Sequence, residues 1–142
     1  MILPPTMQLQ RDHMRIMEMS KMVLLVEDDE DNRDLVRFVL QRSKLGVELL
    51  IAENGQEAID IATKKVPDLI LMDMQMPVMD GWTAVPILKS KIETKNIPII
   101  ALTAQARPED SARTLEIGCA EHHSKPVDPE ELVSIVQKFI QS

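Results

Sequence analysis

Short apolar runs and amphipathic stretches alternate five times along the chain, and this alternation limits the fold more than any other feature. The apolar runs lie at 22–26, 47–52, 68–73 and 97–103, and a fifth predicted strand at 120–125 is the least apolar. The stretches that follow them place apolar residues at helical spacing, over 30–43, 55–65, 82–91, 108–117 and 129–141. Apolar runs without polar alternation are typical of parallel strands covered by helices on both faces. We therefore predict an α/β domain with a doubly wound, five-stranded parallel sheet.

Two of the predicted helices show contrasting patterns. The helix at 30–43 carries an apolar stripe that consists of Leu35, Val36, Phe38, Val39 and Leu40. The helix at 82–91 is weaker, because Pro86 has no N–H to donate to the preceding turn.

The composition argues against several functional classes. The net charge of -7 disfavours nucleic acid or an anionic membrane as the main partner. The aromatic residues Phe38, Trp82 and Phe139 are too few to form a platform for base stacking. Cys119 is the only cysteine, so no internal disulfide can form and a cytoplasmic location is expected. No apolar stretch approaches the roughly 20 residues that a membrane span needs.

The first twenty residues do not follow the alternation. They hold five methionines, and charged residues such as Arg11, Asp12 and Arg15 interrupt any apolar core of a secretory signal. Three interpretations stay open: translation begins at Met19 or Met22, the segment is an accessory or partner-binding helix, or it is a remnant of the expression vector. We predict an N-terminal extension over 1–20 and a single domain over 21–142.

Polar side chains stand at the carboxyl ends of four predicted strands. Glu27 and Asp28 follow the first strand, and Asp73 closes the third. Thr103 closes the fourth strand and Lys125 closes the fifth. In a doubly wound sheet these ends meet along one edge, which is where ligands bind. We therefore expect the five side chains to form one site.

The chemistry of these groups suits phosphoryl transfer to a carboxylate. A carboxylate can attack phosphorus and form an aspartyl phosphate. Nucleophile and phosphoryl group are both anionic, so the reaction needs positive charge nearby. Clustered carboxylates are suitable ligands for Mg²⁺, which prefers oxygen. Lys125 would add a second positive charge, and Thr103 a short hydroxyl donor.

Several motifs make the chain resemble a response-regulator receiver domain of two-component signalling. They are LLVEDDEDNR at the first strand, PDLILMDMQMPVMDG around Asp73, PIIALTA at the fourth strand and SKP at the fifth. The resemblance covers residues 21–141. It implies a flavodoxin-like (βα)5 fold with the strand order 2-1-3-4-5, and a stand-alone receiver of the single-domain type.

The resemblance also implies a role for each acidic position. Asp73 would be the phosphoacceptor and would also contact the metal. Asp28 would bind Mg²⁺ directly, and Glu27 would assist it. The backbone carbonyl of Gln75 would be a further ligand. Asp29 and the two acids after it would instead begin the next helix, where negative charge and capping side chains are favourable.

The switch positions follow from the same resemblance, with one departure. Lys125, which precedes a proline that is often cis in this family, would contact the phosphoryl group. Thr103 would move toward that group together with an aromatic residue three positions before the lysine. Here that residue is His122, where the family commonly carries Tyr or Phe. His122 either serves as a small aromatic ring or makes the switch sensitive to pH. The neighbouring His123 is expected to be a strand histidine with satisfied hydrogen bonds.

The implied function is that of a phosphoacceptor signalling protein rather than an enzyme with its own substrate. A histidine kinase or a phosphotransfer protein would donate the phosphoryl group, and the domain would assist both its phosphorylation and its dephosphorylation. Output would pass to an unknown downstream protein through residues 108–123 and 129–141, from a monomer or a phosphorylation-dependent dimer. Two alternatives stay open. A related hydrolase of small phosphoesters would carry a second Asp where Gln75 stands, and a non-phosphorylated pseudo-receiver would lack one of the site groups.

Overall fold

The computed structural model describes residues 4–11, 20–104 and 107–141. Within the predicted extension, residues 5–11 are helical and exposed, and residues 1–3 and 12–19 lie outside the described residues. In the described parts of the chain, no helix is both long enough and apolar enough to cross a bilayer.

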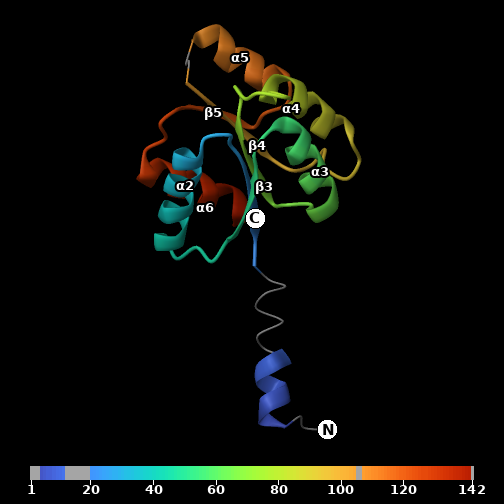
Figure 1. Ribbon diagram of the computed structural model, residues 1–142, viewed down its shortest axis with the longest axis vertical. Coiled ribbons are helices and arrows are strands. Elements are labelled where there is room, and N and C mark those ends of the chain that lie inside the picture. Colours follow the sequence, from blue (N-terminus) through green and yellow to red (C-terminus); the bar gives the residue numbers. More distant parts are fainter. Residues whose placement is uncertain (1–3, 12–19, 105–106, 142) are drawn as a thin grey trace.

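The strands and helices alternate as predicted, and Figure 1 shows their arrangement. The strands are β1 (Met22–Val26), β2 (Glu48–Ala52), β3 (Leu69–Asp73), β4 (Ile99–Thr103) and β5 (Glu121–Ser124). The helices that follow them are α2 (Glu30–Arg42), α3 (Gly55–Lys65), α4 (Gly81–Ser90), α5 (Pro108–Glu116) and α6 (Pro129–Ile140). All neighbouring strands are parallel, in the order β2-β1-β3-β4-β5. The predicted fold class and strand order are confirmed.

The sheet separates two apolar layers. Along β1, Leu24 and Val26 pack on the side of α3 and α4, whereas Val23 and Leu25 pack on the side of α2 and α6. All four side chains are at most 1% exposed. This burial on both faces explains why the central strands β1, β3 and β4 read as continuous apolar runs, whereas the edge strands β2 and β5 are only partly buried.

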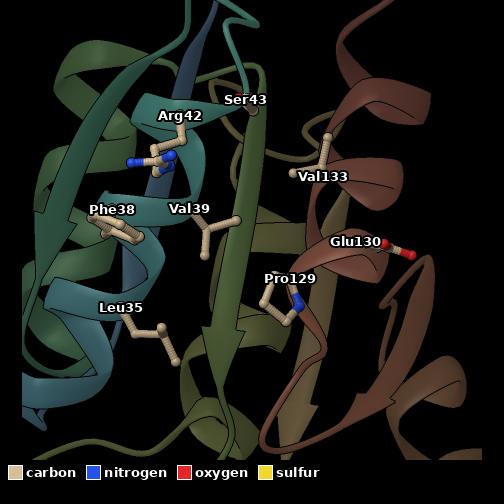
Figure 2. Close-up of a pocket in the computed structure, with 8 residues that line it drawn as sticks. All are labelled: Leu35, Phe38, Val39, Arg42, Ser43, Pro129, Glu130 and Val133. Atoms are coloured by element: carbon tan, nitrogen blue, oxygen red, sulfur yellow. The ribbon is translucent and has the colours of Figure 1, made fainter.

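The apolar stripe on α2 is buried only in part. Val39 and Leu40 are buried, but Leu35 and Phe38 are 47% and 56% exposed. Helix α6 packs beside α2 and leaves an apolar groove of about 500 Å³ between them, to which Leu35 and Phe38 contribute (Figure 2). The stripe is wider than the face that the sheet and α6 cover.

The start of α2 separates the acidic residues after β1 into two groups with different roles. Asp29 is the N-cap of α2, and its side chain accepts a hydrogen bond from the Asp31 amide at 2.9 Å. Glu30 and Asp31 lie in the first turn, where the positive end of the helix dipole favours them. The prediction that these three acids begin the helix is confirmed. They are therefore separate from the two acids that precede them.

Candidate functional site

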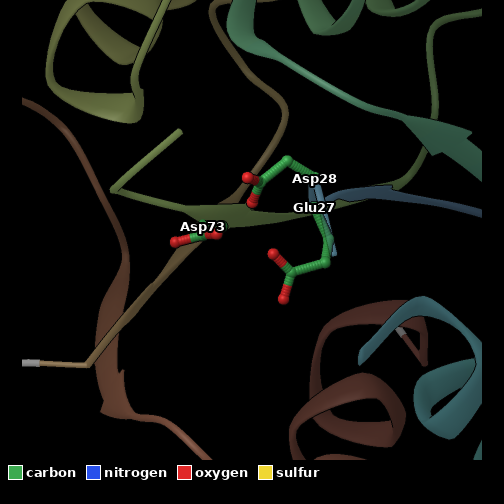
Figure 3. Close-up of side chains that lie close together, drawn as sticks. All are labelled: Glu27, Asp28 and Asp73. Carbon is green, nitrogen blue, oxygen red and sulfur yellow. The ribbon is translucent and has the colours of Figure 1, made fainter. Parts of the chain in front are cut away.

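Three carboxylates converge at the carboxyl edge of the sheet. Glu27 and Asp28 follow β1, and Asp73 is the last residue of β3, the strand that pairs with β1. One carboxylate oxygen from each lies within 4.8 Å of the other two, and Figure 3 shows the three groups around one space. Glu27 and Asp73 are each only 4% exposed, whereas Asp28 is exposed. The sequence prediction brought these three residues together correctly.

Backbone contacts fix the positions of these carboxylates. The Arg33 guanidinium donates to the carbonyl oxygens of Glu27 at 3.1 Å and Asp28 at 3.0 Å, and so holds the loop between β1 and α2. The backbone amide of Gln75 donates to Asp73 Oδ1 at 3.0 Å. This contact places Gln75 at the site and orients the Asp73 side chain.

Lys125 joins the carboxylates from the far side of β4. Its amide donates to the Thr103 carbonyl at 2.8 Å just after β5 ends, and its peptide bond to Pro126 is cis. Its Nζ donates to Glu27 Oε1 at 2.7 Å and lies 3.3 Å from Asp73 Oδ2. The contact with Glu27 was not predicted, because nothing in the sequence indicates which of three acids the lysine selects.

The site holds more negative charge than its lysine offsets. Burial and the neighbouring Asp73 carboxylate raise the pKa of Glu27, and Lys125 opposes this only in part. Burial disfavours the charge on Lys125, but the contacts with Glu27 and Asp73 outweigh it and raise the pKa of Lys125. Glu27 Oε2 is buried and has no hydrogen-bond partner among the described residues. An unpartnered carboxylate oxygen beside two further carboxylates fits a small divalent cation with oxygen ligands.

Thr103 lies where the prediction placed it. It ends β4, which lies between β3 and β5, and its side chain is 3% exposed. The neighbouring residue Leu102 pairs with Asp73, and the Thr103 carbonyl accepts a hydrogen bond from the Lys125 amide. Thr103 therefore lies on the strand between β3, which ends at Asp73, and β5, which is followed by Lys125.

The two histidines of β5 have different surroundings. His123 contacts Glu131 Oε1 through Nδ1 at 2.7 Å and Glu121 Oε1 through Nε2 at 2.9 Å, as expected for a satisfied strand histidine. His122 is half-buried, and its buried Nε2 has no partner in the described part of the chain. Burial, followed by the neighbouring His123, lowers the pKa of His122, and Asp110 opposes this shift.

The lowered pKa of His122 predicts a specific dependence of stability on pH. In the unfolded chain His122 takes up a proton near its ordinary value of 6.5, whereas the folded protein resists protonation to lower pH. The stabilisation is therefore present above pH 6.5 and is lost as the pH falls through the lowered folded value.

We expect urea unfolding to show this as a difference between the wild type and His122→Phe. Between about pH 7.5 and about pH 5.5, the wild type should lose more unfolding free energy than the variant. The other titrating groups are common to both proteins. Parallel losses in the two proteins would show that His122 does not titrate in this way.

The groove between α2 and α6 is another prominent pocket, but its side chains are mostly apolar and do not form a metal-binding cluster. Five of the eight residues around it are apolar and one is a serine. The two charged residues are Arg42 and Glu130 (Figure 2). Within the described residues, the cluster of Glu27, Asp28 and Asp73 is the one group of three or more side chains able to hold a metal ion. The acidic edge is therefore the candidate site.

Comparisons with known proteins agree with this geometry. The family model of the response regulator receiver domain matches residues 23–137. The polar-differentiation response regulator DivK of Brucella anthropi is 38% identical over 122 residues, which cover 86% of this chain and 98% of DivK.

Two solved structures show the same fold. The receiver domain of the sensor histidine kinase PA1611 from Pseudomonas aeruginosa, solved with a magnesium ion coordinated in its active-site cleft, is 32% identical with a TM-score of 0.78, covering 87% of this chain and 99% of that one. The chemotaxis response regulator CheY4 of Vibrio cholerae is 32% identical with a TM-score of 0.77, covering 84% and 98%. This chain belongs to the response-regulator receiver domain family of two-component systems.

Proposed function

We propose that this receiver domain accepts a phosphoryl group on Asp73 in a Mg²⁺-dependent reaction, with a histidine kinase or a histidine phosphotransfer protein as donor. The observation that carries the proposal is the position of Asp73. Its nearly buried carboxylate lies beside two other carboxylates and within 3.3 Å of the Lys125 ammonium. A carboxylate so placed can act as nucleophile while other groups offset its charge.

The acidic residues would hold the metal. Asp28, Glu27 and Asp73 would supply carboxylate oxygens, and Gln75 its backbone carbonyl. The bound Mg²⁺ would offset the negative charge of carboxylate and phosphoryl group. The magnesium ion coordinated in the cleft of the PA1611 receiver domain supports this assignment by similarity.

The other residues would position the reacting groups. Lys125 Nζ lies close enough to Asp73 to contact a phosphoryl oxygen attached there. Thr103 would donate its hydroxyl to a second phosphoryl oxygen. The Gln75 amide donates to Oδ1, and Oδ2, which lies 3.3 Å from the Lys125 ammonium, would be the attacking atom. The same groups would assist hydrolysis of the acyl phosphate, which resets the domain without making it an enzyme for an external substrate.

The signal would leave the domain through protein contacts. A phosphoryl group adds charge beside Lys125 and Thr103 and would favour one of two arrangements of the neighbouring elements. The surface formed by α5, β5 and α6, with His122 as the switch residue, is the proposed contact face for a downstream protein. The acidic net charge argues against nucleic acid as the partner, and a cytoplasmic location fits a receiver.

Incubation with acetyl phosphate tests the proposed chemistry directly. We expect the intact protein to gain the mass of one phosphoryl group in the presence of Mg²⁺ and none in the presence of EDTA. Asp73→Asn should gain none under either condition. A gain that persists in this variant would contradict the assignment, and release of many phosphates per chain from p-nitrophenyl phosphate would favour a hydrolase.

A further inference from the structure

Arg33 contacts the main chain of both acids that follow β1. Its Nη1 donates to the carbonyl oxygens of Glu27 at 3.1 Å and Asp28 at 3.0 Å, so one amino group serves two consecutive residues. Its Nη2 lies 3.4 Å from Glu53 Oε1, on the loop after β2, and the Arg33 side chain is only 14% exposed. The contacts with Glu27 and Asp28 are with their carbonyls and not with their carboxylates.

The end of β1 is held on its other side by the sheet. The Glu27 amide donates to the Ala52 carbonyl at 2.9 Å, which continues the pairing of β1 with β2. Asp29 is the N-cap of α2, so Asp28 lies between a strand and a helix and belongs to neither. Hydrogen bonds from a guanidinium are charge-assisted and therefore stronger than those between neutral groups. Arg33 thus restricts the two residues from which the carboxylates project.

The rigidity of its ligands affects which divalent cation a site prefers. Mg²⁺ needs near-octahedral geometry with oxygen ligands at about 2.0–2.1 Å, whereas Ca²⁺ accepts irregular geometry and oxygen ligands at about 2.3–2.6 Å. Ligands that are already held in place spend less free energy on ordering when the ion binds. A mobile pair of carboxylates can still adjust to the larger ion. Fixing the loop therefore favours Mg²⁺ more than Ca²⁺.

We propose that Arg33 is a positioning residue that gives the acidic site its preference for Mg²⁺ over Ca²⁺. This inference rests on the proposed function, in which Glu27 and Asp28 help to hold the metal. Arg33 acts through the main chain of these two residues and does not bind the metal itself. Its own positive charge opposes the binding of a cation nearby. The positioning effect and the charge effect on Mg²⁺ affinity therefore have opposite signs, and an experiment can separate them.

The test compares two arginines of α2. Arg33→Gln removes the contacts with the loop, and Arg37→Gln is the matched control. Arg37 lies one turn farther along the helix, where its side chain is 45% exposed and its Nη1 lies 2.9 Å from Asp34 Oδ1. Both substitutions remove one positive charge from the same helix. Isothermal titration calorimetry measures the affinities for MgCl₂ and CaCl₂, and amide hydrogen exchange of the metal-free proteins reports on residues 27–29.

We expect Arg33→Gln to bind Mg²⁺ about tenfold more weakly than the wild type, the lower end of the range for changes around a metal site. Its Ca²⁺ affinity should fall by less, so that the ratio of the two affinities decreases. Amide exchange should be faster over residues 27–29 and unchanged in β3. Arg37→Gln should bind both metals at least as tightly as the wild type. Should Arg33→Gln fail to fold, the pair Arg33→Lys and Arg37→Lys is measured instead, and only the former should lose Mg²⁺ affinity.

Four outcomes would overturn the proposal. They are a Mg²⁺ affinity in Arg33→Gln that equals or exceeds that of the wild type, equal losses of Mg²⁺ and Ca²⁺ affinity, the same losses in Arg37→Gln, and unchanged amide exchange over residues 27–29. The first would mean that the charge of Arg33 dominates, and the second that the substitution damages the site as a whole. Failure of the wild type to bind Mg²⁺ is distinguishable from all four, since it would overturn the proposed function and this inference with it.

Discussion

Asp28→Ala is expected to weaken Mg²⁺ binding by at least about tenfold, on the scale of effects seen when groups around metal sites are changed. Asp28 is the exposed member of the carboxylate cluster, and its side chain has no ion pair among the described residues that would compete with a metal. Asp31→Ala is the matched control. It removes the same charge from the first turn of α2, three residues farther along the chain. We expect little change in Mg²⁺ affinity from this control.

The intrinsic fluorescence of Trp82 provides the measurement. Trp82 is the only tryptophan and directly follows Gly81, where a Cβ would lie 3.0 Å from the Asp73 carbonyl. Titration with MgCl₂ should therefore report binding at the acidic site. Equal losses of affinity in the two variants would mean that Mg²⁺ responds to the general negative charge of this segment rather than to a site that includes Asp28.

Lys125→Met is expected to lower the unfolding free energy by about 3 kcal/mol in the presence of EDTA, the lower end of the range for breaking a buried ion pair. The Lys125 side chain is only 20% exposed, and the Glu27 side chain with which it pairs is 5% exposed. The substitution leaves Glu27 and Asp73 close together without their ammonium partner. Added Mg²⁺ should restore part of the loss, because it binds the folded state and not the unfolded chain.

Lys138→Met is the control for this prediction. Lys138 also pairs with a glutamate, Glu121, but its side chain is 65% exposed. Exposed pairs contribute less than about 1 kcal/mol, so this variant should unfold at nearly the wild-type urea concentration. Urea unfolding followed by far-UV circular dichroism measures both variants. A loss for Lys125→Met no larger than that for Lys138→Met would contradict the presence of a buried, stabilising ion pair at the site.

Most of the fold could be predicted because the local patterns and the tertiary structure agree. The run at 22–26 is apolar at every position, and the structure buries it between two helical layers. Asp128 followed by Pro129 is a typical start of a helix, and the Asp128 side chain accepts hydrogen bonds from two amides of the first turn of α6. Pro86 weakened the prediction for its helix, yet α4 runs for ten residues around it.

The packing of α2 could not be predicted in the same way. An apolar stripe shows which side chains can be buried, but not how far a neighbouring helix extends over them. Leu35 and Phe38 remain exposed because α6 leaves a groove beside them. Some of this exposure is compensated by the Arg42 guanidinium, which lies 5.2 Å from the centre of the Phe38 ring.

The same distinction applies to the candidate site, where the members could be predicted but the contacts between them could not. Its members could be predicted, because parallel strands bring their carboxyl ends to one edge whatever their loops contain. The pairing inside the site could not, because Glu27 and Lys125 are 98 residues apart and only the strand order and side-chain orientation decide their contact. The positive φ of Val78 was also beyond prediction, since a valine gives no local signal for a left-handed turn.

The central claim is that Asp73 is the residue that carries the phosphoryl group, and borohydride mapping tests it most directly. Protein treated with acetyl phosphate and Mg²⁺ is reduced with sodium borohydride, which converts an aspartyl phosphate to homoserine, and is then digested and sequenced by tandem mass spectrometry. We predict homoserine at position 73 and at no other aspartate. Homoserine at Asp28 or elsewhere, or its absence throughout, would contradict the account.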